Sequence, residues 1–117
     1  MKKVLLTAIF GLTLVLASAQ AEASDVYVGK SDATGYVCYI MTETIDFYWD
    51  GNTIISTATL KMRDDYGEAH YLNYTFFDFQ GKGADLRFQN SQGYSGEADL
   101  RSTPIEWAMY EVIRQRY

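Results

Sequence analysis

Cys38 and His70 are the only cysteine and the only histidine of this 117-residue chain, and they are the residue types best suited to nucleophilic chemistry. A cysteine thiol needs a nearby base before it acts as a nucleophile. Both residues fall in stretches with the composition of β-strands, so they could face each other across neighbouring strands. The sequence indicates no third group that would orient the histidine. We therefore expect no catalytic residue in this chain.

Three other roles for Cys38 can be weighed from its surroundings. No Leu-x-x-Cys pattern ends the apolar run near the N-terminus, and Cys38 lies far downstream of that run, which excludes a lipid anchor. A single cysteine excludes a disulfide within the chain and leaves a homodimer bridged through Cys38 as the less favoured alternative. Free cysteine is among the most buried residue types. We expect Cys38 to be a core residue of a strand.

Metal and cofactor chemistry finds little support in the residue pattern. Asp64, Asp65 and Glu68 could offer carboxylate oxygens to Ca²⁺, but their spacing matches no known calcium loop and is typical of a solvated turn. His70 has no companion at metal-ligand spacing. The chain contains no phosphate-binding loop, dinucleotide fingerprint or nucleophile elbow. We predict a chain without metal or cofactor and without enzymatic activity.

A set of aromatic residues outside the expected core is the more informative feature. Trp, Tyr and Arg contribute most of the binding energy at protein interfaces. One tryptophan lies near a hairpin tip, one tyrosine lies in a glycine-containing loop, and three residues fall on the expected outer face of a C-terminal helix. The predicted partner-binding residues are Trp49, Tyr94, Trp107, Tyr110 and Arg114.

The N-terminus has the layout of a secretory signal peptide. Lys2 and Lys3 precede an uncharged apolar run over residues 4–17, and "SAQAEA" follows with small residues at cleavage-site spacing. The run is shorter than the roughly 20 apolar residues that a membrane span needs. We expect residues 1–23 to be cleaved, after Ala23 or Ala21, with Ala19 as the less favoured alternative, which leaves no membrane anchor. Residues 24–117 would then form one exported domain, periplasmic or secreted.

The charge of the chain restricts its partners. The formal net charge is −5, and the loss of two lysines with the leader makes the remaining domain more acidic. An acidic surface repels phosphate groups, so we expect no nucleic-acid partner.

Alternating and β-branched residues predict five strands that would position these side chains. The strands are expected over residues 25–30, 36–45, 53–63, 69–80 and 84–90. Asp50-Gly51 predicts a tight hairpin turn between the second and third strands. Apolar residues change phase between Phe76 and Phe77, which predicts a β-bulge there.

A helix is expected from Pro104 to about Tyr117. Thr103-Pro104-Ile105-Glu106 has the pattern of a capping box with proline at the first helical position. Helical periodicity places five apolar residues toward the sheet and leaves Trp107, Tyr110 and Arg114 on the outer face; the five are Ile105, Ala108, Met109, Val112 and Ile113. The predicted fold is α+β, a curved antiparallel meander of about five strands with one C-terminal helix packed on it.

Two segments carry a family resemblance. "DVYVGKSDATGYVCYIMTETI" and "STPIEWAMYEVIRQRY" resemble a group of small uncharacterised exported bacterial proteins. The layout is more distantly similar to surface-adhesin protein E-like domains, and this similarity implies binding of host matrix proteins at the cell surface. The expected function is an exported, non-enzymatic binding module that acts through a protein–protein surface. The alternative is a small envelope enzyme, or an inhibitor of one, that uses Cys38 or His70.

Overall fold

The structure is a computed structural model that describes residues 24–80 and 86–117, so the predicted leader at residues 1–23 lies outside the described residues. The described chain folds into six strands, one α-helix and a final 3₁₀ turn. Their bounds are β1 Asp25–Lys30, β2 Val37–Asp50, β3 Thr53–Arg63, β4 Ala69–Asp78, β5 Leu86–Asn90, β6 Ser95–Glu97, α2 Pro104–Ile113 and η1 Arg114–Arg116.

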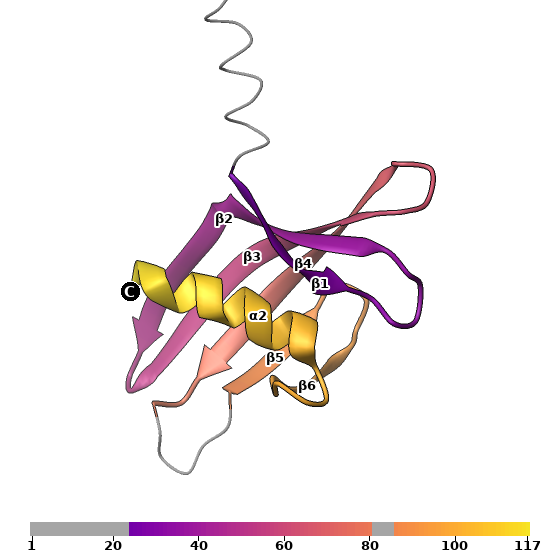
Figure 1. The fold of residues 1–117 in the computed structure, drawn as a ribbon. Helices are drawn as coiled ribbons and strands as arrows, with labels where there is room; N and C mark the ends of the chain where they lie inside the picture. Colours follow the sequence, from indigo (N-terminus) through magenta and orange to yellow (C-terminus); the bar gives the residue numbers. More distant parts are fainter. Residues whose placement is uncertain (1–23, 81–85) are drawn as a thin grey trace, which may run out of the picture.

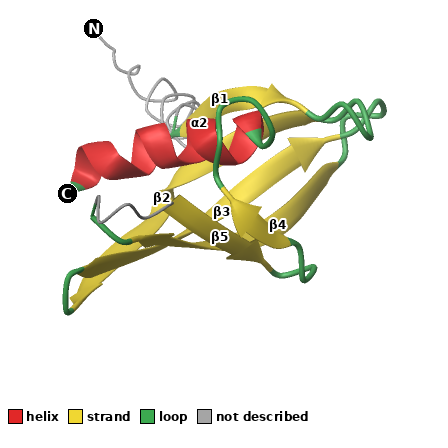
Figure 2. Ribbon diagram, turned by 90° about the horizontal axis from the view of Figure 1, so that it is seen from below, coloured by secondary structure: helices red, strands yellow, loops and turns green. Residues whose placement is uncertain are grey.

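The strands form one antiparallel sheet in the order β1-β2-β3-β4-β5-β6, which is a meander. The helix α2 crosses this sheet on one side (Figure 1). Seen from below, the sheet curves beneath the helix, so the helix lies in the hollow of a half-barrel (Figure 2). This arrangement confirms the predicted α+β class. The sixth strand, β6, is only three residues long and lies in a stretch that the sequence analysis interpreted as a loop.

Turns and bulges set the shape of the sheet. Asp50 pairs with Thr53 across a two-residue turn, and Gly51 has a φ of 63°, which confirms the predicted hairpin. The bulge predicted at Phe76 and Phe77 is wrong, because β4 keeps its register with both neighbours through these residues. The register instead shifts in β1 between Tyr27 and Gly29, and in β2 between residues 41 and 46. Simple alternation explains the two phenylalanines, one on each face of β4.

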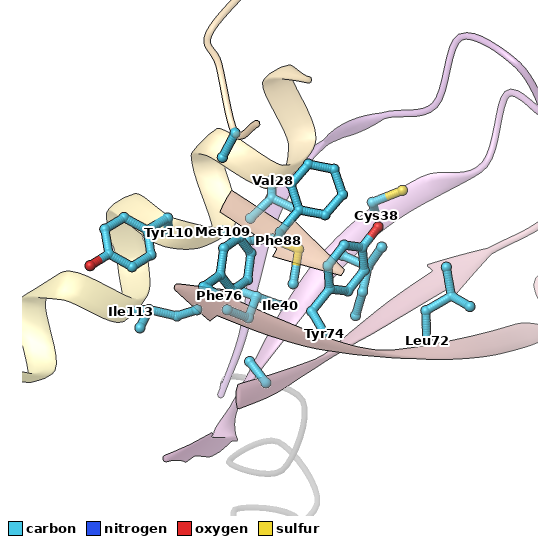
Figure 3. Close-up of a cluster of buried hydrophobic side chains, with 13 residues drawn as sticks. Val28, Cys38, Ile40, Leu72, Tyr74, Phe76, Phe88, Met109, Tyr110 and Ile113 are labelled. Carbon is cyan, nitrogen blue, oxygen red and sulfur yellow. The ribbon is translucent and has the colours of Figure 1, made fainter. Parts of the chain in front are cut away.

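The core lies between the concave face of the sheet and α2. Cross-strand partners share a face of the sheet, so the row Ser56, Phe76 and Phe88 points inward together. Phe76 and Phe88 are almost fully buried, as are Met109 and Ile113 of the helix. Figure 3 shows the helix side chains meeting the strand side chains in this cluster. Aromatic side chains of β4, β5 and α2 and aliphatic side chains of the strands and the helix together fill this core.

The helix begins where the sequence predicts, but not through a capping box. Thr103 is the N-cap residue, yet its hydroxyl makes no hydrogen bond to the first turn. It donates to the carbonyl of Glu97 at 2.8 Å and accepts from the amide of Asp99 at 2.7 Å, which fastens the preceding loop. Glu106 is directed to the sheet instead of back to the cap. Within the part of the chain that the structure describes, no helix has the length and apolar character needed to cross a membrane.

Candidate functional site

The structure does not gather the five predicted partner-binding residues into one surface. Trp49 is 58 % exposed near the β2–β3 hairpin turn. Trp107, Tyr110 and Arg114 together line a hollow of about 440 Å³ beside the end of β4. Tyr94 lies in the β5–β6 loop and lines a different cavity, with its ring 5.4 Å from that of Phe88. The structure thus brings the three helix residues to one hollow and leaves Trp49 and Tyr94 in separate places.

The prediction that Tyr110 faces outward is wrong. Its side chain is buried against the sheet, where the ring lies 5.6 Å from that of Phe76. Its hydroxyl donates to the carboxylate of Asp78, which is what allows a polar group to be buried there. The buried stripe of the helix therefore contains Glu106 and Tyr110 beside the apolar Met109 and Ile113. Hydrophobic periodicity could not find this stripe, because two of its members depend on partners in β4.

A second concave site, a cavity of about 400 Å³, lies on the inner face of the half-barrel. The β1–β2 loop, the β5–β6 loop and the first turn of α2 surround it. Its floor is apolar and consists of inner-face side chains of β2, β3 and β4. The lining residues are Ser31, Ala33, Thr34, Tyr36, Cys38, Leu60, Met62, His70, Leu72, Tyr74, Asn90, Gln92, Tyr94, Ile105 and Glu106.

Tyr74 and Glu106 form the principal polar contact of this cavity. The Tyr74 hydroxyl donates to Oε2 of Glu106 at 2.7 Å, and both side chains are almost completely buried. Burial raises the pKa of Tyr74, and the hydrogen bond to the Glu106 carboxylate raises it further, because both disfavour the charged phenolate. Among the described residues, the second carboxylate oxygen of Glu106 has no hydrogen-bond partner. A carboxylate with one oxygen open to the cavity thus lies at the wall, above an apolar floor.

Cys38 belongs to the same wall and has the environment of a core residue. It is 1 % exposed, and its thiol lies 3.6 Å from the carbonyl oxygen of Tyr36. Figure 3 shows the hydroxyl group of Tyr74 directed toward it. Burial raises the pKa of the thiol, which keeps it protonated near neutral pH. This environment supports the predicted core role.

Cys38 and His70 are not cross-strand neighbours, although both line the cavity. Cys38 pairs with Met62, and Met62 pairs with His70, so an entire strand separates them. Two strand spacings amount to about 9.6 Å, beyond the reach of a hydrogen bond. The suggested nucleophile and base are therefore kept apart by the sheet register.

We expect Cys38 to resist alkylation in the native protein. Iodoacetamide reacts with the thiolate, and a buried thiol with a raised pKa offers little of it. Mass spectrometry after treatment at pH 7.5 should show almost no modification without denaturant and complete modification in 6 M guanidinium chloride, roughly the concentration that unfolds even very stable domains. Rapid modification of the native protein, or a mass equal to a disulfide-linked pair of chains, would contradict this assignment.

The side chain of His70 lies on the rim of the cavity and interacts with Asp64 and Tyr36. Its Nε2 lies 2.9 Å from Oδ2 of Asp64, and its ring stacks on that of Tyr36 at a centroid distance of 5.4 Å. The hydrogen bond to His70 holds the pKa of Asp64 below its usual range. The fold does bring Asp64, Glu68 and His70 within 4.8 Å of one another, a grouping that the sequence spacing did not indicate. Asp64 also accepts the amides of Tyr66 and Glu68, so its oxygens already serve the β3–β4 turn.

No family model, curated protein or solved structure matches this chain. The resemblance to exported bacterial proteins and to adhesin-like domains therefore stays a prediction. The pair that the sequence analysis missed as a site is Tyr74 and Glu106, which lie 32 residues apart in the chain. The only local signal was a glutamate in the first turn of a predicted helix, and that signal indicated a cap.

Proposed function

We propose that this chain is an exported, non-enzymatic binding module whose ligand enters the cavity on the inner face of the half-barrel. The observation that carries the proposal is the cavity itself. Its volume of about 400 Å³ falls in the range of small-molecule sites. An apolar floor with a few polar groups on the wall is the usual composition of such sites.

The state of Cys38 and His70 supports a binding role over a catalytic one. Cys38 is buried with a raised thiol pKa, and His70 is engaged by Asp64. The sheet register separates the two by Met62, so neither can activate the other. This register argues against Cys38 and His70 acting together as a nucleophile and its base.

The proposal places the binding site in the cavity and not on the aromatic surface predicted from the sequence. Tyr94 is the one predicted partner-binding residue that lines the cavity. Export is supported by the leader pattern of residues 1–23 alone, and N-terminal sequencing of protein recovered outside the cytoplasm tests it. A recovered chain that begins at residue 22 or 24 agrees with export, and one that begins at Met1 contradicts it.

A neutral apolar dye tests whether the cavity accepts a ligand. We expect N-phenyl-1-naphthylamine to bind the folded protein with saturable fluorescence enhancement and one site per chain. Ala33 is an exposed loop residue that lines the cavity, so Ala33→Trp places an indole in the mouth without disturbing the core. This variant should bind the dye at least about tenfold more weakly, a loss of roughly 1.4 kcal/mol.

Asp65→Trp is the matched control, because it adds the same indole to the exposed β3–β4 turn, away from the cavity lining. Its affinity for the dye should equal that of the unsubstituted protein. The absence of saturable dye binding, or equal binding by the two tryptophan variants, would disprove a ligand site in this cavity.

A further inference from the structure

The charges that line the cavity are unbalanced. Glu106 is its only carboxylate, and the described lining contains neither lysine nor arginine. His70 is the one lining side chain that could become positively charged, and it is already bound to Asp64. The cavity therefore has no fixed positive charge that could pair with an anionic ligand. It has one negative charge, on Glu106, that could pair with a cation.

One carboxylate oxygen of Glu106 is open to the cavity. The side chain is 8 % exposed, and Tyr74 donates to one of its two oxygens. The other oxygen makes no hydrogen bond within the described residues and is not fully buried, so a ligand in the cavity can reach it. A largely buried carboxylate is stabilised by a positively charged partner, and a cation at this oxygen would supply one. A metal ion fits poorly, since hard cations take six or more oxygen ligands and the lining supplies one carboxylate.

Three tyrosines surround the same space. Tyr36 comes from the start of β2, Tyr74 from β4 and Tyr94 from the β5–β6 loop. Stacking on His70 holds the ring of Tyr36, and stacking on Phe76 holds that of Tyr74. The faces of aromatic rings attract cations, and cages of several such rings bind quaternary ammonium groups.

We propose that the cavity binds an organic ammonium ion that carries an apolar group. The positively charged nitrogen contacts the free oxygen of Glu106 and the tyrosine rings, and the apolar group covers Leu60, Met62 and Leu72 on the floor. This inference rests on the proposed function and adds the chemical class of the ligand.

The charge of the ligand can be tested with two probes of the same shape. Choline and 3,3-dimethylbutan-1-ol differ in that a quaternary nitrogen replaces a quaternary carbon. We expect choline to bind at least about tenfold more tightly in ¹H–¹⁵N NMR titrations. Hexyltrimethylammonium should bind more tightly than choline, by roughly fourfold for each additional methylene group that is buried on the cavity floor.

Glu106→Gln should weaken choline binding at least about tenfold and leave the affinity for 3,3-dimethylbutan-1-ol unchanged. Glutamine still offers an oxygen to the Tyr74 hydroxyl, so the fold keeps its hydrogen bond. Glu111→Gln is the matched control, because it removes the same charge from an exposed position of the same helix. Tyr94→Leu, at a half-exposed loop position, should weaken choline binding by roughly threefold to tenfold.

The outcomes separate this inference from the proposed function. Equal affinity for choline and its neutral analogue, or no effect of Glu106→Gln and Tyr94→Leu on choline binding, would overturn the ammonium assignment while dye binding still supported the cavity as a site. Failure of the dye and of both small probes to bind the unsubstituted protein would remove the proposed function and this inference together.

Discussion

Replacement of Phe76 with alanine is expected to lower the free energy of unfolding by about 3–5 kcal/mol. Phe76 is completely buried at the centre of the core. Its ring lies 5.8 Å from that of Tyr74, 6.3 Å from that of Phe88 and 5.6 Å from that of Tyr110. The substitution therefore removes one large side chain from contacts in β4, β5 and α2. Domains of this size are stable by only about 5–15 kcal/mol, so a large fraction of the variant could be unfolded.

Phe77→Ala is the matched control for this prediction. Phe77 follows directly in β4 but points to the opposite face, where it is only half-buried. We expect it to cost less than half as much as Phe76→Ala. Urea denaturation followed by circular dichroism measures both values, provided that the slope with denaturant is unchanged. Equal losses for the two variants would contradict the register of β4.

The two phenylalanines also show what the sequence could and could not determine in the sheet. Alternation assigned Phe76 to the inner face, and Asp50-Gly51 located the β2–β3 turn. The same pattern suggested a bulge between Phe76 and Phe77, because both faces of β4 are apolar there. The actual register shifts lie in β1 and β2, the two strands whose backbones pack most extensively against α2. A register shift of this kind depends on tertiary packing, which leaves no clear trace in local residue order.

Stability is expected to fall steeply above about pH 10, the pKa of an exposed tyrosine. Tyr74 and Tyr110 both have a raised pKa in the folded protein, first through burial and then through hydrogen bonds to Glu106 and Asp78. Above pH 10 the unfolded chain loses the two protons and the folded chain keeps them. The contribution of the two tyrosines to the free energy of unfolding is therefore fully present below pH 10. It is lost as the pH rises toward the pKa values of the folded protein. Each group lowers the free energy of unfolding by about 1.4 kcal/mol per pH unit in this range.

Urea denaturation at several pH values between 8 and roughly 12 measures this slope, which starts near the pKa of free tyrosine. Tyr74→Phe and Tyr110→Phe should each remove one titrating group from this slope. Near neutral pH each should also cost about 1–3 kcal/mol, because one oxygen of the partner carboxylate loses its donor. Tyr66→Phe is the control, because Tyr66 is 93 % exposed and should change neither quantity. A slope that both buried variants leave unchanged would show that these hydroxyls are not held as the structure shows.

The helix illustrates why the site was harder to predict than the fold. Thr103 and Pro104 correctly marked where α2 begins, and Met109 and Ile113 were correctly assigned to the core. Glu106 and Tyr110 were not, because a polar side chain is expected in solvent unless its partner is known. Their partners, Tyr74 and Asp78, belong to a strand 32 residues earlier in the chain. The buried carboxylate of Glu106 beside the cavity becomes apparent only when the helix is packed on the sheet.

The most direct test of a ligand site within the half-barrel is a ¹H–¹⁵N NMR titration of the protein with hexyltrimethylammonium. The cavity predicts that the largest shifts fall on backbone amides of the β1–β2 loop, the β5–β6 loop and the first turn of α2, around Ala33, Tyr94 and Glu106. The amides near Trp49 and Arg114, which lie outside the cavity lining, should move little. Shifts concentrated at Trp49, Trp107 and Arg114 with the cavity amides unmoved would contradict the cavity and favour the aromatic surface predicted from the sequence.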